Sequence, residues 1–160
     1  MESKLIKGLN EQYNFEVASG YIYYSMANYV KDKGMDGFAH FFNKQAEEEF
    51  AHAEKLRQFL FEIDVRPELE SIEKPQVEFG TFTETFKTAY EHEQEVTRRI
   101  HEIAEVSKDE DLRVFSFIQA FIDEQVEEED SVSKIVTKLE RAKDNWGALY
   151  ILDGQMFARG

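Results

Sequence analysis

The sequence predicts an all-α protein in which four long amphipathic helices form a bundle. Apolar residues recur every three or four positions through most of the chain, which is the period of a helix with one buried face. The only two prolines, Pro67 and Pro75, both lie in one stretch that lacks this rhythm. At 160 residues the chain can bury a sizeable core, and we expect a single domain spanning residues 1–160.

The helices are bounded by a few short polar breaks. The expected helical segments are residues 5–33, 36–63, 82–106 and 110–142, with a short tail at 148–158. Candidate N-caps stand at three of the starts. Asp36 precedes the second helix, Thr81 and Glu84 have capping-box spacing before the third, and Ser107 or Asp109 precedes the fourth.

Each apolar stripe is interrupted near its middle by side chains that can bind a metal. These are Glu16 in the first helix, Glu49 and His52 in the second, Glu93 in the third, and Gln125 and Glu128 in the fourth. Each lies about fifteen to nineteen positions from the turn that joins its helix pair. At ~1.5 Å rise per residue, all six side chains can meet in one layer about halfway along a bundle ~40 Å long.

Such a layer needs a compensating charge. A single buried carboxylate usually finds an arginine or becomes protonated, but four in one layer would each cost several kcal/mol to bury. The stripes contain no lysine or arginine that could pair with them. Four carboxylates, one imidazole and one amide suit a pair of metal ions, and oxygen-rich ligation favours iron or manganese over structural zinc.

The overall composition excludes several other classes. A formal net charge of −14 disfavours nucleic acid and anionic membrane surfaces as partners. The chain has no cysteine, which excludes disulfides, thiolate metal sites and cysteine nucleophiles. The start "MESKLIKGLNEQ" has no apolar targeting region, and no apolar run approaches the ~18 residues of a membrane span. We therefore expect a cytoplasmic protein.

Several motifs together resemble the prokaryotic non-haem ferritins of the ferritin-like di-iron family. The resemblance runs from "LNEQYNFE" through "QAEEEFAHAEKL", "AYEHEQ" and "IDEQVEEED" to "LYILD". Inward carboxylates with a Glu-x-x-His pair are the known pattern of such bundles. The resemblance implies an iron-storage protein with ferroxidase activity, in which Fe(II) is oxidised by dioxygen or peroxide. It further implies a homo-oligomeric hollow shell of 24 subunits that holds ferric mineral.

The resemblance also implies a role for individual residues. Glu16, Glu49 and His52 would bind the first iron, and Glu49 would bridge to a second iron held by Glu93 and Glu128 with Gln125 close by. Tyr23 matches the family's tyrosine beside the centre and could supply an electron, or could simply pack in the core with a hydroxyl partner. A third iron site would use Glu48, Glu124, Glu127 and Glu128.

The connectivity of the family accounts for the proline-containing segment. Helices two and three would be joined by a long crossover that returns along the bundle. The seventeen residues of 64–80 reach about 56 Å when extended, enough for the ~40 Å required. The tail "GALYILDGQMFARG" would form the family's short fifth helix, although it is short and contains Gly154.

Single sequence positions distinguish this chain from a related class of protein, the bacterioferritins. Bacterioferritin would show a second Glu-x-x-His in the fourth helix and a haem-ligating methionine after Glu49, but this chain has Glu128 and Phe50 there, so no haem is expected. A non-catalytic helical scaffold or interaction protein, with pH-dependent carboxylate pairs, is the rival hypothesis. The remaining histidines, His40, His92 and His101, lie off the stripes and are expected at the surface or an interface. Trp146 is expected to pack at a helix break.

Overall fold

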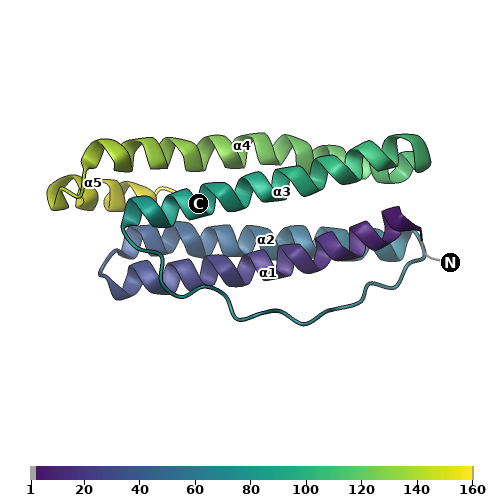
Figure 1. Cartoon of the computed structure of the whole chain (residues 1–160), viewed down its shortest axis with the longest axis horizontal. Helices are drawn as coiled ribbons and strands as arrows, with labels where there is room; N and C mark the ends of the chain where they lie inside the picture. The colour runs from purple at the N-terminus through teal and green to yellow at the C-terminus, as the bar shows by residue number, and fades with distance from the viewer. Residues whose placement is uncertain (1–2, 160) are drawn as a thin grey trace.

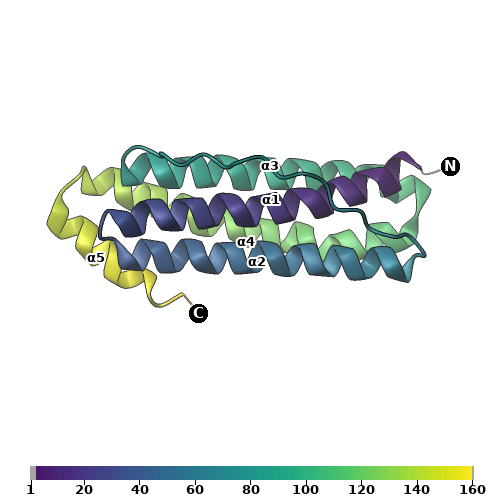
Figure 2. The same ribbon diagram turned by 90° about the horizontal axis from the view of Figure 1, so that it is seen from below.

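A computed structural model describes residues 3–159, and within that range it forms five helices and no strand (Figure 1). The helices are α1 (Lys4–Asp32), α2 (Asp36–Glu62), α3 (Phe82–Glu110), α4 (Leu112–Ala142) and α5 (Trp146–Met156). The first four lie side by side as a bundle, and α5 packs across one end of it (Figures 1 and 2). The predicted four-helix bundle and the short fifth helix are confirmed. Residues 1, 2 and 160 of the expected domain lie outside the described residues.

The observed N-caps of the helices differ in part from the expected ones. Thr81 accepts from the backbone N–H of Glu84 at 3.1 Å, as its capping-box position predicts. Asp36 is not the N-cap of α2, because it is the first helical residue and Met35 precedes it without a side-chain cap bond. Instead, Asp153 from α5 accepts from the backbone N–H of Phe38 at 2.8 Å. A distant helix thus satisfies a donor that helix starts leave unpaired.

The cap between α3 and α4 also differs from the prediction. Neither Ser107 nor Asp109 caps α4, since α3 continues to Glu110 and includes both of them. Asp111 forms the break with extended backbone, and its side chain accepts from the backbone N–H of Arg113 at 2.9 Å. Ser107 is buried and donates within α3 to the carbonyl of Ala104, so its hydroxyl is already used.

The predicted crossover runs the length of the bundle beside α1 (Figures 1 and 2). Two asparagines one turn apart on α1 bind its extended backbone. Asn10 accepts from the N–H of Glu68 at 2.9 Å, and Asn14 accepts from the N–H of Glu70 at 2.8 Å. Near its far end, Tyr29 donates to the carbonyl of Gly80 at 2.5 Å. The segment is therefore held by side-chain bonds although it has no helix or strand of its own.

The apolar core is divided into two parts. One cluster, around Phe42, Phe86 and Leu139, lies toward the α1–α2 turn and includes residues of α5. The other, around Leu9, Leu56 and Ile118, lies toward the opposite end. Between the two clusters each of the four long helices buries polar side chains. The interruptions seen in the sequence are therefore a real polar layer within an otherwise apolar core.

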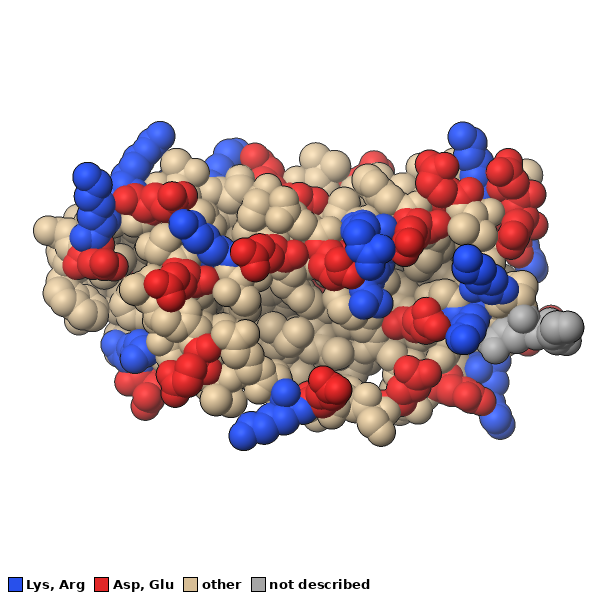
Figure 3. Space-filling view, in the orientation of Figure 1, with Lys and Arg blue, Asp and Glu red and all other residues tan. Residues whose placement is uncertain are grey.

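The outer surface carries both signs of charge. Figure 3 shows acidic and basic side chains interspersed over the face seen in Figure 1. None of the described helices is both long and apolar enough to cross a membrane.

Candidate metal centre

The six side chains predicted to interrupt the stripes do lie in the central layer. Glu16, Glu49 and Glu93 are at most 1% exposed, and His52 and Gln125 are also buried. Glu128 is partly buried at the edge of the layer. The structure thus brings all six residues into the region between the two apolar clusters.

Three of these residues form a compact ligand group. Among the described residues, Glu16, Glu49 and His52 each offer one ligand atom, and these atoms lie within 4.8 Å of one another. His52 Nδ1 lies 3.7 Å from Glu49 Oε2 and 4.0 Å from Glu16 Oε2. Glu16 Oε2, both carboxylate oxygens of Glu49 and His52 Nδ1 are buried without a hydrogen-bond partner. Buried polar atoms rarely stay unpaired, and a cation would satisfy all four.

The orientation of His52 suits metal binding. Its Nε2 lies 2.5 Å from Glu124 Oε2, outside the group. In the neutral tautomer with its proton on Nε2, the ring would donate to this carboxylate and present the lone pair of Nδ1 to Glu16 and Glu49. Such an outer carboxylate commonly fixes the tautomer of a metal-binding histidine. In this arrangement Glu124 therefore acts as the partner of His52.

The other half of the layer is a hydrogen-bonded network around Glu93. Tyr23 is fully buried and donates its hydroxyl to Glu93 Oε1. Gln125 Nε2 lies 3.1 Å from Glu93 Oε2, while Gln45 Nε2 lies 3.1 Å from Glu128 Oε2 and 3.4 Å from Glu93 Oε1. Glu93 and Glu128 are thus linked by one amide, and Gln125 and Tyr23 hold Glu93 from two other sides.

The carboxyl groups resist ionisation while no cation is nearby. Burial raises the pKa of Glu16 well above its usual value, and the neighbouring Glu49 adds to this effect. Burial likewise raises the pKa of Glu49 to about 8, with the charges of Glu93 and Glu128 adding to it. The pKa of Glu128 is also raised to about 8, by burial and by the adjacent Glu48. Below these raised pKa values the carboxyl groups are therefore protonated and neutral, so they need no compensating cation.

An outer pocket adjoins this layer between α2 and α4. Its lining includes all four residues predicted for a third site: Glu48, Glu124, Glu127 and Glu128. His52 lines the same pocket, so the pocket and the buried group share a wall. Two cations pair with its carboxylates, Lys55 with Glu124 at 3.7 Å and Arg159 with Glu48 at 2.9 Å.

Two buried glutamines belong to the site but were not predicted as site residues. Gln12 Nε2 donates to Glu16 Oε1 at 2.9 Å, and Gln45 reaches Glu93 and Glu128 as described above. Each stands four residues before a predicted ligand, Gln12 before Glu16 and Gln45 before Glu49. This repeated one-turn spacing on a buried face was the signal in the sequence.

The remaining predictions on single side chains have mixed outcomes. His101 and Trp146 are exposed, and Trp146 begins α5 with its ring edge-on to Phe82 at 6.2 Å. His92 is partly buried rather than fully exposed: its ring stacks on Phe15 and its Nε2 lies 2.7 Å from Ser19 Oγ. Burial lowers its pKa to about 4, so the ring is neutral.

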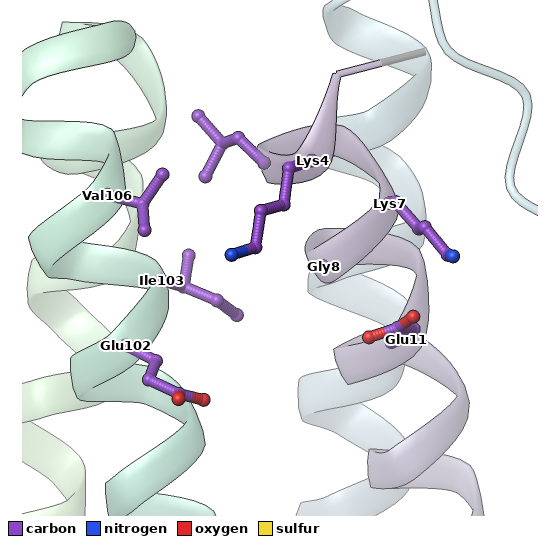
Figure 4. Close-up of a pocket in the computed structure, with 8 residues that line it drawn as sticks. Lys4, Lys7, Gly8, Glu11, Glu102, Ile103 and Val106 are labelled. Atoms are coloured by element: carbon purple, nitrogen blue, oxygen red, sulfur yellow. The ribbon is translucent and has the colours of Figure 1, made fainter.

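A surface groove at the far end of the bundle differs from the central layer in its charges. It opens between the start of α1 and the last turns of α3. Figure 4 shows Lys4 and Lys7 with Glu11 and Glu102 around its edge. Charges of both signs surround an apolar floor that includes Ile103. Among the described residues, none of the buried ligand atoms that lack a hydrogen-bond partner lies at this groove, so the central layer remains the candidate.

Comparisons with known proteins show which family the chain resembles. A family model described as a ferritin-like domain matches residues 6–142. The chain is 35% identical to a bacterial non-heme ferritin of Staphylococcus aureus (strain USA300), over 99% of this chain and 96% of that protein. It is 36% identical to a protein of the same name from Staphylococcus haemolyticus (strain JCSC1435), over 99% of this chain and 96% of that one.

Solved structures give the same result. The chain aligns with an open pore ferritin from the archaeon Archaeoglobus fulgidus with a TM-score of 0.97 and 37% identity, covering 100% of this chain and 99% of that one. A structure titled humanized archaeal ferritin aligns with a TM-score of 0.96 and 38% identity, covering 100% and 99%. With the family model spanning most of the chain and these relatives covering nearly all of it, this protein belongs to the ferritin family.

Proposed function

We propose that this protein stores iron and oxidises Fe²⁺ at the central layer. The observation that carries the proposal is the convergence of unpaired buried ligand atoms from Glu16, Glu49 and His52. Membership of the ferritin family and similarity to proteins named non-heme ferritin support iron as the cation.

In this proposal the residues divide between two neighbouring iron positions. Glu16, Glu49 and His52 bind the first Fe²⁺, and Glu93 with Glu128 binds the second. Glu49 lies between them, as its electrostatic coupling to both Glu93 and Glu128 supports. Gln125 orients Glu93 through its 3.1 Å hydrogen bond and remains a candidate ligand through its oxygen.

The proposed reaction transfers one electron from each of two Fe²⁺ ions to the same dioxygen. Dioxygen takes up two protons and leaves as hydrogen peroxide, while the two Fe³⁺ ions pass into storage. Anionic oxygen ligands stabilise Fe³⁺ over Fe²⁺, which favours oxidation. The carboxyl protons held by Glu49 and Glu128 are released when iron binds. Tyr23 donates a hydrogen bond to Glu93 and so holds that ligand in place, and this two-electron reduction of dioxygen needs no electron from the tyrosine.

Storage requires a cavity that one subunit does not provide. We propose a homo-oligomeric shell of 24 copies in the cytoplasm, with the outer pocket of Glu48, Glu124, Glu127 and Glu128 as a third iron position. No haem is part of this proposal. A native mass measurement tests the shell, and a species near the 18.8 kDa of the single chain would contradict storage.

The function is tested by adding two Fe²⁺ per subunit without oxygen and then admitting air. We expect rapid absorbance growth from Fe³⁺, well above a buffer blank, with the iron eluting with the protein on size-exclusion chromatography. Oxidation at the blank rate would contradict the proposal and favour the scaffold hypothesis. In the scaffold case, the raised carboxyl pKa values would serve only pH-dependent packing.

A further inference from the structure

The end of the chain folds back along α2 and brings a positive charge to the outer pocket. Arg159 Nη2 lies 2.9 Å from Glu48 Oε1, and the Arg159 side chain is only 18% exposed. Its guanidinium carbon lies 4.7 Å from the centre of the Phe41 ring, on the same helix as Glu48. The guanidinium is therefore held between an aromatic face and a carboxylate, which is a favourable place for arginine.

Contacts on both sides hold the tail that carries Arg159. The Asp153 side chain binds the backbone N–H of Phe38 at 2.8 Å, which ties α5 to the start of α2. Farther along the tail, His40 Nε2 lies 2.7 Å from the carbonyl oxygen of Arg159. The rings of His40 and Phe157 also pack at 5.8 Å. The guanidinium thus reaches its carboxylate from an anchored position.

The two cations at the pocket are held differently. Lys55 lies 3.7 Å from Glu124, and both side chains are at least 40% exposed. Such a long, solvated pair contributes little and is easily displaced. The pair of Arg159 with Glu48 is shorter, better buried and stacked on Phe41. A cation that enters the pocket therefore meets a Glu48 that is already engaged.

We propose that Arg159 competes with cations for Glu48 and so keeps the cation affinity of the outer pocket low. This inference rests on the proposed function, because that function makes the pocket of Glu48, Glu124, Glu127 and Glu128 a cation site. The competing charge comes from the chain itself, through a tail anchored by His40 and Asp153.

The experiment measures binding of Zn²⁺, which cannot be oxidised, to the assembled metal-free protein by isothermal titration calorimetry. We expect two tighter binding events per subunit and one weaker event, which Glu127→Gln weakens further. Arg159→Gln should tighten the weak event about fivefold, the effect of removing one pair of this kind. Arg159→Lys keeps the charge but loses the planar group that stacks on Phe41, so its weak event should fall between those of wild type and Arg159→Gln. Arg57→Gln, which removes an exposed arginine from α2, the helix of Glu48, is the control.

Other results of the Zn²⁺ titration would contradict the inference, and they can be told apart from a failure of the proposed function. Unchanged or weaker Zn²⁺ binding in Arg159→Gln would contradict competition, while the proposed function would stand. No third event in wild type would contradict both the third position and the role of Arg159, but not iron oxidation in the central layer. Size-exclusion chromatography checks assembly. His40→Ala, which releases the tail but keeps Arg159, should tighten the weak event in the same direction.

Discussion

His52 Nε2 lies 2.5 Å from Glu124 Oε2, and this contact turns His52 Nδ1 toward Glu16 and Glu49. The contact joins α2 to α4, so a residue of α4 orients the candidate ligand His52 on α2. Removing an outer partner of a metal-binding histidine commonly lowers metal affinity 10- to 100-fold.

Glu124→Gln should therefore weaken binding of the first metal ion by about tenfold, because a neutral amide holds the Nε2 proton less strongly. The measurement is the tightest Zn²⁺ dissociation constant of metal-free protein. Asp123→Asn removes a carboxylate from the adjacent exposed position and should leave that constant unchanged. Equal affinity in Glu124→Gln and wild type would show that His52 is oriented by something else.

Gln45→Leu should slow the rapid phase of Fe²⁺ oxidation by about tenfold while the bundle stays folded. Leucine fills a similar volume but cannot donate to Glu93 and Glu128, which would lose the amide that links them. Stopped-flow absorbance after air is admitted gives the rate. Gln58→Leu, an exposed position on the same helix, is the control. A wild-type rate in Gln45→Leu would mean that the amide has no part in the site.

Tyr23→Phe should leave the assembly and its thermal stability nearly unchanged and should slow oxidation several-fold. Phenylalanine keeps the packing against Phe42 and removes only the hydroxyl that donates to Glu93. The same stopped-flow measurement applies, with Tyr24→Phe at the exposed neighbouring position as control. If both variants oxidise iron at the wild-type rate, Tyr23 is only a core residue.

The metal-free protein should lose stability as the pH rises from about 4.5 to 8. The pKa of Glu49 is about 8 in the folded protein against 4.5 as its ordinary value, so the folded state binds more protons within this window. The free energy of unfolding of the protein then falls by up to about 1.4 kcal/mol for each unit of rising pH because of this one group. Glu49→Gln cannot ionise and should show a shallower decline in melting temperature. A decline as steep as that of wild type would contradict the raised pKa.

Much of the candidate site could be predicted from the sequence because its residues obey helical periodicity. Glu16, Glu49 and Glu93 interrupt apolar stripes, and a stripe defines the buried face of its helix without further information. Gln12 and Gln45 lie on the same faces one turn before Glu16 and Glu49, but a neutral amide costs less to bury than a carboxylate, so the stripe alone does not require these two side chains to bind a metal.

Other features depend on contacts between segments far apart in the chain, which periodicity does not specify. Asp153 replaces Asp36 as the cap of α2 because α5 crosses the end of the bundle. Arg159 reaches Glu48 for the same reason. His92 lies off its stripe yet is covered by Phe15, because neighbouring helices enclose more than one face of α3.

The most direct test of the central claim compares two variants, Glu49→Ala and Glu47→Ala. The measurement is the rate at which each rapidly oxidises two Fe²⁺ per subunit. Both variants lose one carboxylate from α2, but Glu47 is exposed and pairs with Lys44 at the surface. We predict that Glu49→Ala loses the rapid phase while its assembly stays intact on size-exclusion chromatography, and that Glu47→Ala keeps the wild-type rate. A wild-type rapid phase in Glu49→Ala would contradict the assignment of the central layer as the site of iron oxidation.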